Sequence, residues 1–434
     1  MSFIKSALIA LLLAPSTGMA QGIDDLYRDA RVAEEAGNWV AAVDIYGKII
    51  KDNPEQSMAL FALSKASLKI DDLRGAQKSI IGAIEKDPHN ENYRAFADEI
   101  GKITDGLKDG RRSHDNRDYP SAIRKYDALL AEYPEFATLH YYKGLSLQGG
   151  GSTGDAVKSF RTARQLNPRE EKYSKAMRTM AVRQYQEGER FYRIRDWAPA
   201  QEHFETALDI DPTFSQGYYR LARTLSQQGL VTQALDILEK SIRTNPAYLT
   251  AYLEKGNILR SEQRFKEAAS AYRAALSVDP DAYRAMVGLG QSLKAENPTQ
   301  ASKHLKAALA LKPDNITANE MLGEIYSEQE KYLQAKPYLE KAVELKPDDH
   351  VKLWRLAYVE NNLGNFESAK LLARKSVGID NKFQPSWFEL GKARKELNEI
   401  PGAVAAFKKA ETGSDRSTAA DASRERKQMK SSGK

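Results

Sequence analysis

A run of small residues, Gly149-Gly-Gly-Ser-Thr-Gly-Asp155, is the part of this 434-residue sequence most similar to a phosphate-binding loop. Such loops follow a β-strand and carry a lysine after their last glycine, where its ammonium group meets the phosphates. Here Asp155 takes the lysine position and would repel a phosphate, and no strand-like segment precedes the run. We therefore interpret 149–155 as a turn between two helices.

Residues that could form a metal site or a catalytic centre are scattered along the chain. None of the six histidines has a partner at a spacing typical of metal ligands. The chain has no cysteine, which excludes thiolate ligands and disulfide bonds. The carboxylates are distributed as solvated helix faces. The sequence therefore predicts no cofactor, no metal ion and no enzymatic activity.

Two other sets of side chains are suited to binding. Aromatic residues bring a large contact area with little conformational entropy to lose. Cationic and carboxamide side chains can grip carboxylates or backbone carbonyls. We predict a partner-binding groove formed by Tyr141, Tyr185, Tyr219, Arg223, Asn257, Arg260, Arg284, Gln291, Lys294, Trp354 and Phe388. The alternative is that these aromatic rings pack partly against neighbouring helices and that the basic residues are ordinary surface charge.

Evenly spaced prolines reveal the elements that would position these side chains. An interval of 34 residues occurs five times in the series Pro54, Pro88, Pro134, Pro168, Pro212, Pro246, Pro280, Pro313 and Pro347. An alanine commonly precedes the proline by twelve residues and a large apolar residue by eight, as at Ala268 and Tyr272. This period indicates about eleven helix-turn-helix units.

Each unit is predicted to contain two amphipathic helices joined by a polar turn. A glycine or alanine often lies 24 residues before the proline, as Gly256 does, and we expect it where the two helices of a unit approach closely. Neither helix can bury its apolar face alone. Stacking successive units would therefore create one continuous core with contacts only between neighbours.

These features resemble the tetratricopeptide repeat (TPR) family, whose motif is W-x2-L-G-x2-Y followed by A-x3-F, A and P. The segment 252–259, Tyr-Leu-Glu-Lys-Gly-Asn-Ile-Leu, with Ala268, Tyr272, Ala275 and Pro280 is a near-complete copy. The resemblance implies an all-α fold, a right-handed superhelical solenoid whose concave groove binds proteins. The first helix of each unit, helix A, would line that groove. The predicted groove residues occupy the second, fifth, ninth and twelfth positions of helix A.

Residues 1–20 differ from the rest of the chain. Lys5 precedes an apolar run, and small, turn-prone residues follow as far as Ala20. This order is typical of a signal peptide, and the apolar run is too short to span a bilayer. We expect an exported protein, periplasmic or secreted, without a transmembrane segment in its mature chain.

The mature chain is predicted to contain three blocks of repeats. Repeats 1–2 cover 23–88, repeats 3–4 cover 103–168 and repeats 5–11 cover 181–411. The prolines are farther apart at 89–102 and 169–180, which we interpret as helical inserts that either act as hinges or are simply tolerated. The basic tail, 412–434, lacks apolar periodicity and is predicted to be disordered.

The composition limits the class of partner. A net charge of +6 over 434 residues is not the dense basic surface of a nucleic-acid binder. We predict a non-enzymatic scaffold or adaptor of the periplasm or cell envelope that binds partner peptides or helices. Two alternatives stay open: an accessory module of polysaccharide synthesis or secretion machinery, which could bind polysaccharide, and a co-chaperone of the endoplasmic reticulum lumen that holds unfolded chains.

Overall fold

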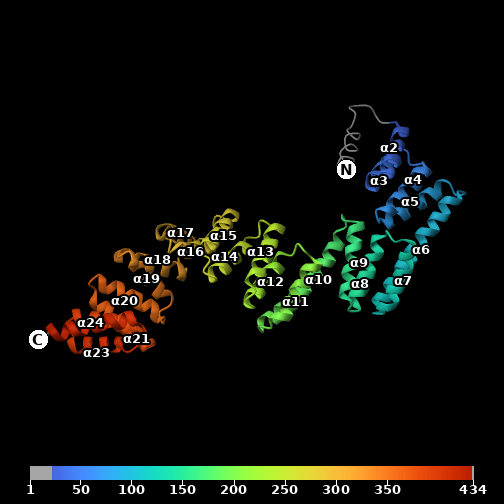
Figure 1. Ribbon diagram of the computed structural model, residues 1–434. Helices are drawn as coiled ribbons and strands as arrows, with labels where there is room; N and C mark the ends of the chain where they lie inside the picture. Colours follow the sequence, from blue (N-terminus) through green and yellow to red (C-terminus); the bar gives the residue numbers. More distant parts are fainter. Residues whose placement is uncertain (1–21, 433–434) are drawn as a thin grey trace. The chain divides into compact units, whose positions relative to one another are not determined.

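The computed structural model describes residues 22–432, and within this range it contains α-helices and no β-strand. Short turns join successive helices, and most helices contact the next one in the sequence (Figure 1). The predicted all-α solenoid of helix-turn-helix units is therefore confirmed. The predicted signal peptide, residues 1–20, lies outside the described residues.

The chain divides after Arg183 into two compact units, which we call unit 1 and unit 2. Unit 1 contains α2 (Ile23–Glu35), α3 (Trp39–Asp52), α4 (Ser57–Lys69), α5 (Leu73–Lys86), α6 (Glu91–Asp115), α7 (Tyr119–Glu132), α8 (Ala137–Gly149) and α9 (Thr153–Leu166). The boundary falls within α10 (Glu171–Arg193).

Unit 2 contains α11 (Trp197–Ile210), α12 (Ser215–Gln227), α13 (Val231–Thr244), α14 (Leu249–Ser261), α15 (Phe265–Val278), α16 (Tyr283–Leu293), α17 (Pro298–Leu311), α18 (Ile316–Glu328), α19 (Tyr332–Leu345), α20 (His350–Asn362), α21 (Phe366–Ile379), α22 (Gln384–Glu396), α23 (Ile400–Glu411) and α24 (Arg416–Ser432). The even-numbered helices α2 to α22 are the helices A of the predicted repeats, and each is followed by its helix B.

A glycine of helix A meets a large residue of helix B in several repeats. A Cβ atom added to Gly256 would lie 2.6 Å from the Tyr272 ring, and one added to Gly391 would lie 2.6 Å from the Phe407 ring. Carbon atoms do not approach this closely without displacement. The expectation that these glycines allow the two helices of a repeat to come together is confirmed.

The apolar residues of the repeat form a continuous core through the middle of unit 2. Ala268 and Tyr272 are almost completely buried, and their cluster extends from Leu259 to Val359 across several repeats. Within the run at 149–155, Gly149 is the last residue of α8, and residues 153–155 begin α9. Residues 150–152 form the turn between α8 and α9, and Gly151 has a left-handed φ of 86°. Glycine adopts this conformation without steric cost, which accounts for its presence in the turn.

Both inserts are helical. The residues added before the third repeat make α6 25 residues long, and those added before the fifth repeat make α10 23 residues long. Most of the other helices A, such as α4 and α8, have 13 residues. Each insert thus lengthens helix A at its N-terminus.

A hydrogen-bond network spans the first insert. The carboxylate of Asp71, in the turn before α5, accepts hydrogen bonds from the Thr138 amide at 3.1 Å and the Thr138 hydroxyl at 2.7 Å. It also accepts one from the Tyr173 hydroxyl at 2.6 Å. These bonds connect the second repeat to α8 and to the start of α10. The two blocks separated at 89–102 in the sequence therefore belong to one compact unit.

The prediction of a disordered tail at 412–434 is wrong for residues 416–432, which form α24. Ala422 and Met429 of this helix are buried against Ala403 and Phe407 of α23. Ion pairs add to the contact, with Arg426 Nε 2.6 Å from Glu411 Oε1. The helix covers the core of the last repeat, as terminal caps of repeat arrays do.

Candidate partner-binding site

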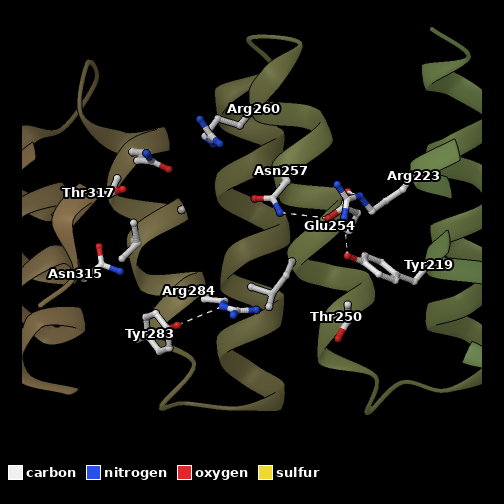
Figure 2. Close-up of a pocket in the computed structure, with 14 residues that line it drawn as sticks. Tyr219, Arg223, Thr250, Glu254, Asn257, Arg260, Tyr283, Arg284, Asn315 and Thr317 are labelled. Carbon is white, nitrogen blue, oxygen red and sulfur yellow. Dashed lines mark hydrogen bonds and ion pairs between the residues drawn. The ribbon is translucent and has the colours of Figure 1, made fainter. Parts of the chain in front are cut away.

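The helices A of four successive repeats, α12, α14, α16 and α18, form a concave pocket in unit 2 (Figure 2). Its volume is about 590 Å³. Six of the eleven predicted groove residues line it: Tyr219, Arg223, Asn257, Arg260, Arg284 and Gln291. The remaining lining residues are Thr250, Leu253, Glu254, Tyr283, Val287, Gly288, Asn315 and Thr317. We call this the cationic pocket because three arginines and a single carboxylate line it.

Tyr219, Arg223 and Glu254 form a network between α12 and α14 (Figure 2). Arg223 Nη1 donates a hydrogen bond to the Tyr219 hydroxyl at 3.2 Å, and Arg223 Nε lies 3.4 Å from Glu254 Oε1. Asn257 Nδ2 donates to Glu254 Oε2 at 3.4 Å. One carboxylate is thus shared by two donors, which fixes the side chains and leaves the positive charge in excess.

Arg260 lies beside this network, on the next turn of α14. The Tyr272 hydroxyl of α15 donates a 2.8 Å hydrogen bond to Asn257 Oδ1, which orients the amide. Burial raises the pKa of Tyr272, and the nearby Arg260 guanidinium acts in the opposite direction. Arg260 Nε is buried, and nothing within residues 22–432 accepts a hydrogen bond from it. The protein therefore leaves this guanidinium incompletely paired.

The start of α16 adds a further positive group to the pocket. Arg284 Nε donates to the Tyr283 hydroxyl at 3.3 Å, and Lys312 Nζ donates to the same oxygen at 3.4 Å. These two donors lower the pKa of Tyr283. Both cations are on exposed side chains, so they remain accessible to a ligand.

Three of the predicted aromatic groove residues lie outside the cationic pocket and pack against helix B of their own repeat. The ring centres are separated by 5.8 Å in Tyr141–Phe160, 5.6 Å in Tyr185–Phe204 and 5.8 Å in Phe388–Phe407. Each ring is half-buried. Part of their surface thus belongs to the core, as in the alternative interpretation, and their role in binding stays a prediction.

The last two predicted residues also lie outside the cationic pocket. Trp354 lines a separate pocket of about 270 Å³ together with Arg355 and Tyr358. Lys294 Nζ lies 2.9 Å from Glu324 and 2.8 Å from Glu328. Two carboxylates therefore neutralise the charge of Lys294, which makes it a weaker anchor than Arg260.

Profiles of one family, described as Tetratricopeptide repeat, match this chain in four segments. One profile matches residues 110–171 and 253–316, and a second matches 195–254 and 292–357. Together the matches cover just over half of the sequence. The chain belongs to the tetratricopeptide repeat family. Stacked repeats of this kind form extended concave surfaces that bind proteins, and they generally do so without catalysing a reaction.

Several curated TPR proteins are similar to part of the chain. Anaphase-promoting complex subunit 3 of Schizosaccharomyces pombe is 24% identical over 259 residues, which are 54% of this chain and 38% of that protein. The DnaJ homolog subfamily C member 7 homolog of Dictyostelium discoideum is 25% identical over 175 residues, 38% of this chain and 32% of that protein. The chain thus spans about a third of the length of these relatives.

Among solved structures, yeast Tom70 is 14% identical, with 94% of this chain and 89% of that chain covered at a TM-score of 0.36.

The TPR register explains most of the cationic pocket. Thr250 and Thr317 take the second position of their helices A, so the same rule that predicted Arg284 covers them. Glu254, Tyr283, Gly288 and Asn315 fall outside the four positions. Tyr283 is the first residue of α16, and Asn315 is the N-cap of α18. Both residues therefore lie at the start of a helix A, a place that the four positions do not include.

Two features are absent from the part of the chain that the structure describes. Within 22–432, no group of three or more His, Asp or Glu side chains is arranged to hold a metal ion. In the same range, no helix combines the length and the apolar character needed to cross a bilayer.

Proposed function

We propose that this TPR chain is a non-enzymatic scaffold or adaptor, and that it holds an acidic segment of a partner protein in the cationic pocket. The observation that carries the proposal is the convergence of Arg223, Arg260 and Arg284 on one pocket whose single carboxylate, Glu254, is already shared. A ligand carboxylate or carbonyl would complete the hydrogen bonds of the guanidinium groups.

The geometry favours an extended segment over a small molecule. The lining residues come from four consecutive helices A, and they alternate between charged groups and amide or hydroxyl groups that can pair with a peptide backbone. Tyr219 adds an aromatic face beside Arg223. A bound segment would thus place acidic side chains at the arginines and its backbone at Asn257 and Gln291.

The proposed location is outside the cytosol. It rests on the signal-peptide pattern of residues 1–20. The partners would then be envelope or secreted proteins.

The experiment is affinity capture from a cell-envelope fraction with the chain from Gln21 onward. The triple variant Tyr219→Ala, Arg223→Gln, Arg260→Gln is compared with Arg243→Gln, which removes one exposed guanidinium on α13 outside the pocket. Mass spectrometry identifies the retained proteins, and circular dichroism checks that each variant is helical. We expect a short list of proteins that the Arg243→Gln variant retains and the triple variant loses.

The same proteins retained by all variants would reject the cationic pocket as the binding site. The other two functions have their own outcomes. Binding of soluble oligosaccharides on a glycan panel would favour the polysaccharide accessory. Capture of many unrelated unfolded proteins, together with ATP-independent suppression of aggregation of a reduced model substrate, would favour the co-chaperone.

A further inference from the structure

A second pocket, of about 430 Å³, lies in unit 1. Its apolar lining comes from four parts of the sequence: Trp39 of α3, Leu68 of α4, Phe96 and Ile103 of α6, and Tyr133 and Phe136 in the turn between α7 and α8. Phe136 is 5% exposed and Ile103 is fully buried, whereas Trp39, Phe96 and Tyr133 are half-buried. The pocket therefore has a closed apolar floor and aromatic walls that reach solvent.

The first helical insert supplies one of these walls. Phe96 and Glu99 belong to the residues that lengthen α6 beyond an ordinary helix A. The Phe96 ring packs edge-on against Phe61 of α4, with ring centres 5.6 Å apart. This contact holds Phe96 beside Leu68. Leu68 itself packs against two apolar clusters of unit 1. An insert that only increased the length of the chain would not need to place an aromatic ring there.

The rim of this pocket is acidic. Four carboxylates line it, those of Glu34, Glu99, Glu132 and Glu135, against the two ammonium groups of Lys65 and Lys69. Lys69 is partly engaged, since its Nζ lies 3.9 Å from Glu135 and 6.0 Å from the centre of the Trp39 ring. Burial raises the pKa of Tyr133, and Glu99 and Glu132 raise it further. The potential at the mouth is thus negative, opposite to that of the cationic pocket.

We propose that this acidic-rimmed pocket is a second peptide-binding site, which takes one large apolar side chain of a partner segment with Lys or Arg residues on either side of it. The apolar floor buries the central side chain. The carboxylates at the rim attract the flanking cations and disfavour acidic segments. The site is independent of the cationic pocket, because the preferred peptide has the opposite charge.

The test uses fluorescein-labelled peptides and the chain from Gln21 onward, with binding followed by fluorescence anisotropy. The probe contains Lys-Ser-Leu-Ser-Lys, in which alternate residues share one face of an extended chain. Two comparison peptides replace both Lys by Glu or the Leu by Ser. We expect the probe to bind about three- to tenfold more tightly than either comparison peptide at low salt, and its affinity to fall as salt is added.

Matched charge reversals locate the site. Glu99→Lys, at the rim, is compared with Asp98→Lys, which makes the same change one residue earlier in α6 on an exposed side chain that does not line the pocket. We expect Glu99→Lys to weaken probe binding about three- to tenfold and Asp98→Lys to change it less than about twofold. Glu132→Lys, on α7, repeats the test from a second helix in case one variant is misfolded.

Three outcomes would overturn the proposal. The first is equal binding of the three peptides, and the second is an equal loss of binding in Glu99→Lys and Asp98→Lys. The third is the absence of probe binding at about 1 mM peptide, a concentration that detects even weak complexes. None of these results bears on the cationic pocket, whose test uses other residues and the capture of envelope proteins.

Discussion

Glu389 is a buried carboxylate between two helices A of unit 2. Its side chain is 3% exposed, and Asn361 Nδ2 of α20 donates to Glu389 Oε2 at 2.7 Å and to the Glu389 carbonyl at 3.0 Å. Lys392 Nζ lies 3.4 Å from the same carboxylate. Burial raises the pKa of Glu389, because the loss of hydration costs the charged form more than Lys392 and Asn361 return.

The raised pKa of Glu389 predicts how stability depends on pH. A carboxyl group whose pKa is higher in the folded state contributes stability below its unfolded pKa, and this contribution is lost as the pH rises through the folded pKa. Glu389→Gln is neutral at every pH. We therefore expect Glu389→Gln to raise the free energy of unfolding at pH 8 by about 1–3 kcal/mol, seen as a higher urea midpoint. At pH 4 we expect little change in either quantity.

The control for Glu389 is Glu396→Gln, an exposed position on the same helix, α22. It should leave the urea midpoint nearly unchanged at both pH values. If Glu389→Gln destabilised the protein at pH 8, the ionised carboxylate would be a net stabilising group and its assigned cost would be incorrect.

At the scale of single elements, α24 shows how a few apolar residues can fix a helix. Ala422 and Met429 are seven residues apart, which places them on the same side of the helix, and both are buried on the last repeat. Around them the helix is rich in Ser, Lys and Arg. Too few apolar positions are present to give a visible period, so the sequence did not reveal this helix.

We predict that Ala422→Asp detaches α24 from the last repeat. The substitution puts a charge against the apolar surface of α23, at a cost of about 2 kcal/mol or more. Hydrogen exchange measured by mass spectrometry should become faster in α24 and in α22 and α23. Ala420→Asp adds the same charge at an exposed position of the helix and should have little effect. Equal exchange in both variants would show that α24 is not held through this face.

The sequence predicted the helix pairs and much of the cationic pocket, for a physical reason. The contact between Gly256 and Tyr272 recurs as Gly391 and Phe407, because the two helices of each repeat pack in the same way. The register is therefore visible in a single sequence. The residues that line the cationic pocket follow the same register for the most part. The register did not predict the core contacts of Tyr141 and Tyr185. Ring packing depends on which side chain lies opposite in the folded chain, here Phe160 and Phe204.

At the scale of the whole molecule, the chain consists of two compact units, each with its own core. Most helices pack mainly on their sequence neighbours. In such arrays, stability is the sum of repeat and nearest-neighbour terms, so a local change should spread only to adjacent repeats. The Asp71 network is an exception within unit 1, because it connects residues 67 and 102 positions apart.

This exception predicts different ranges of effect for two substitutions. Asp71→Ala removes three hydrogen bonds and puts alanine at a φ of 68°, which together cost about 2–4 kcal/mol. Amide exchange should accelerate in α5, α8 and the start of α10, well beyond the next repeat.

Gly256→Ala, which forces a Cβ against Tyr272, should cost about 1–3 kcal/mol and accelerate exchange only in α12 to α17. Gly47→Ala, where an added Cβ meets nothing within 4 Å, is the control and should not destabilise α3. An Asp71→Ala effect confined to α4 and α5 would show that the network does not couple the repeats on the two sides of the first insert.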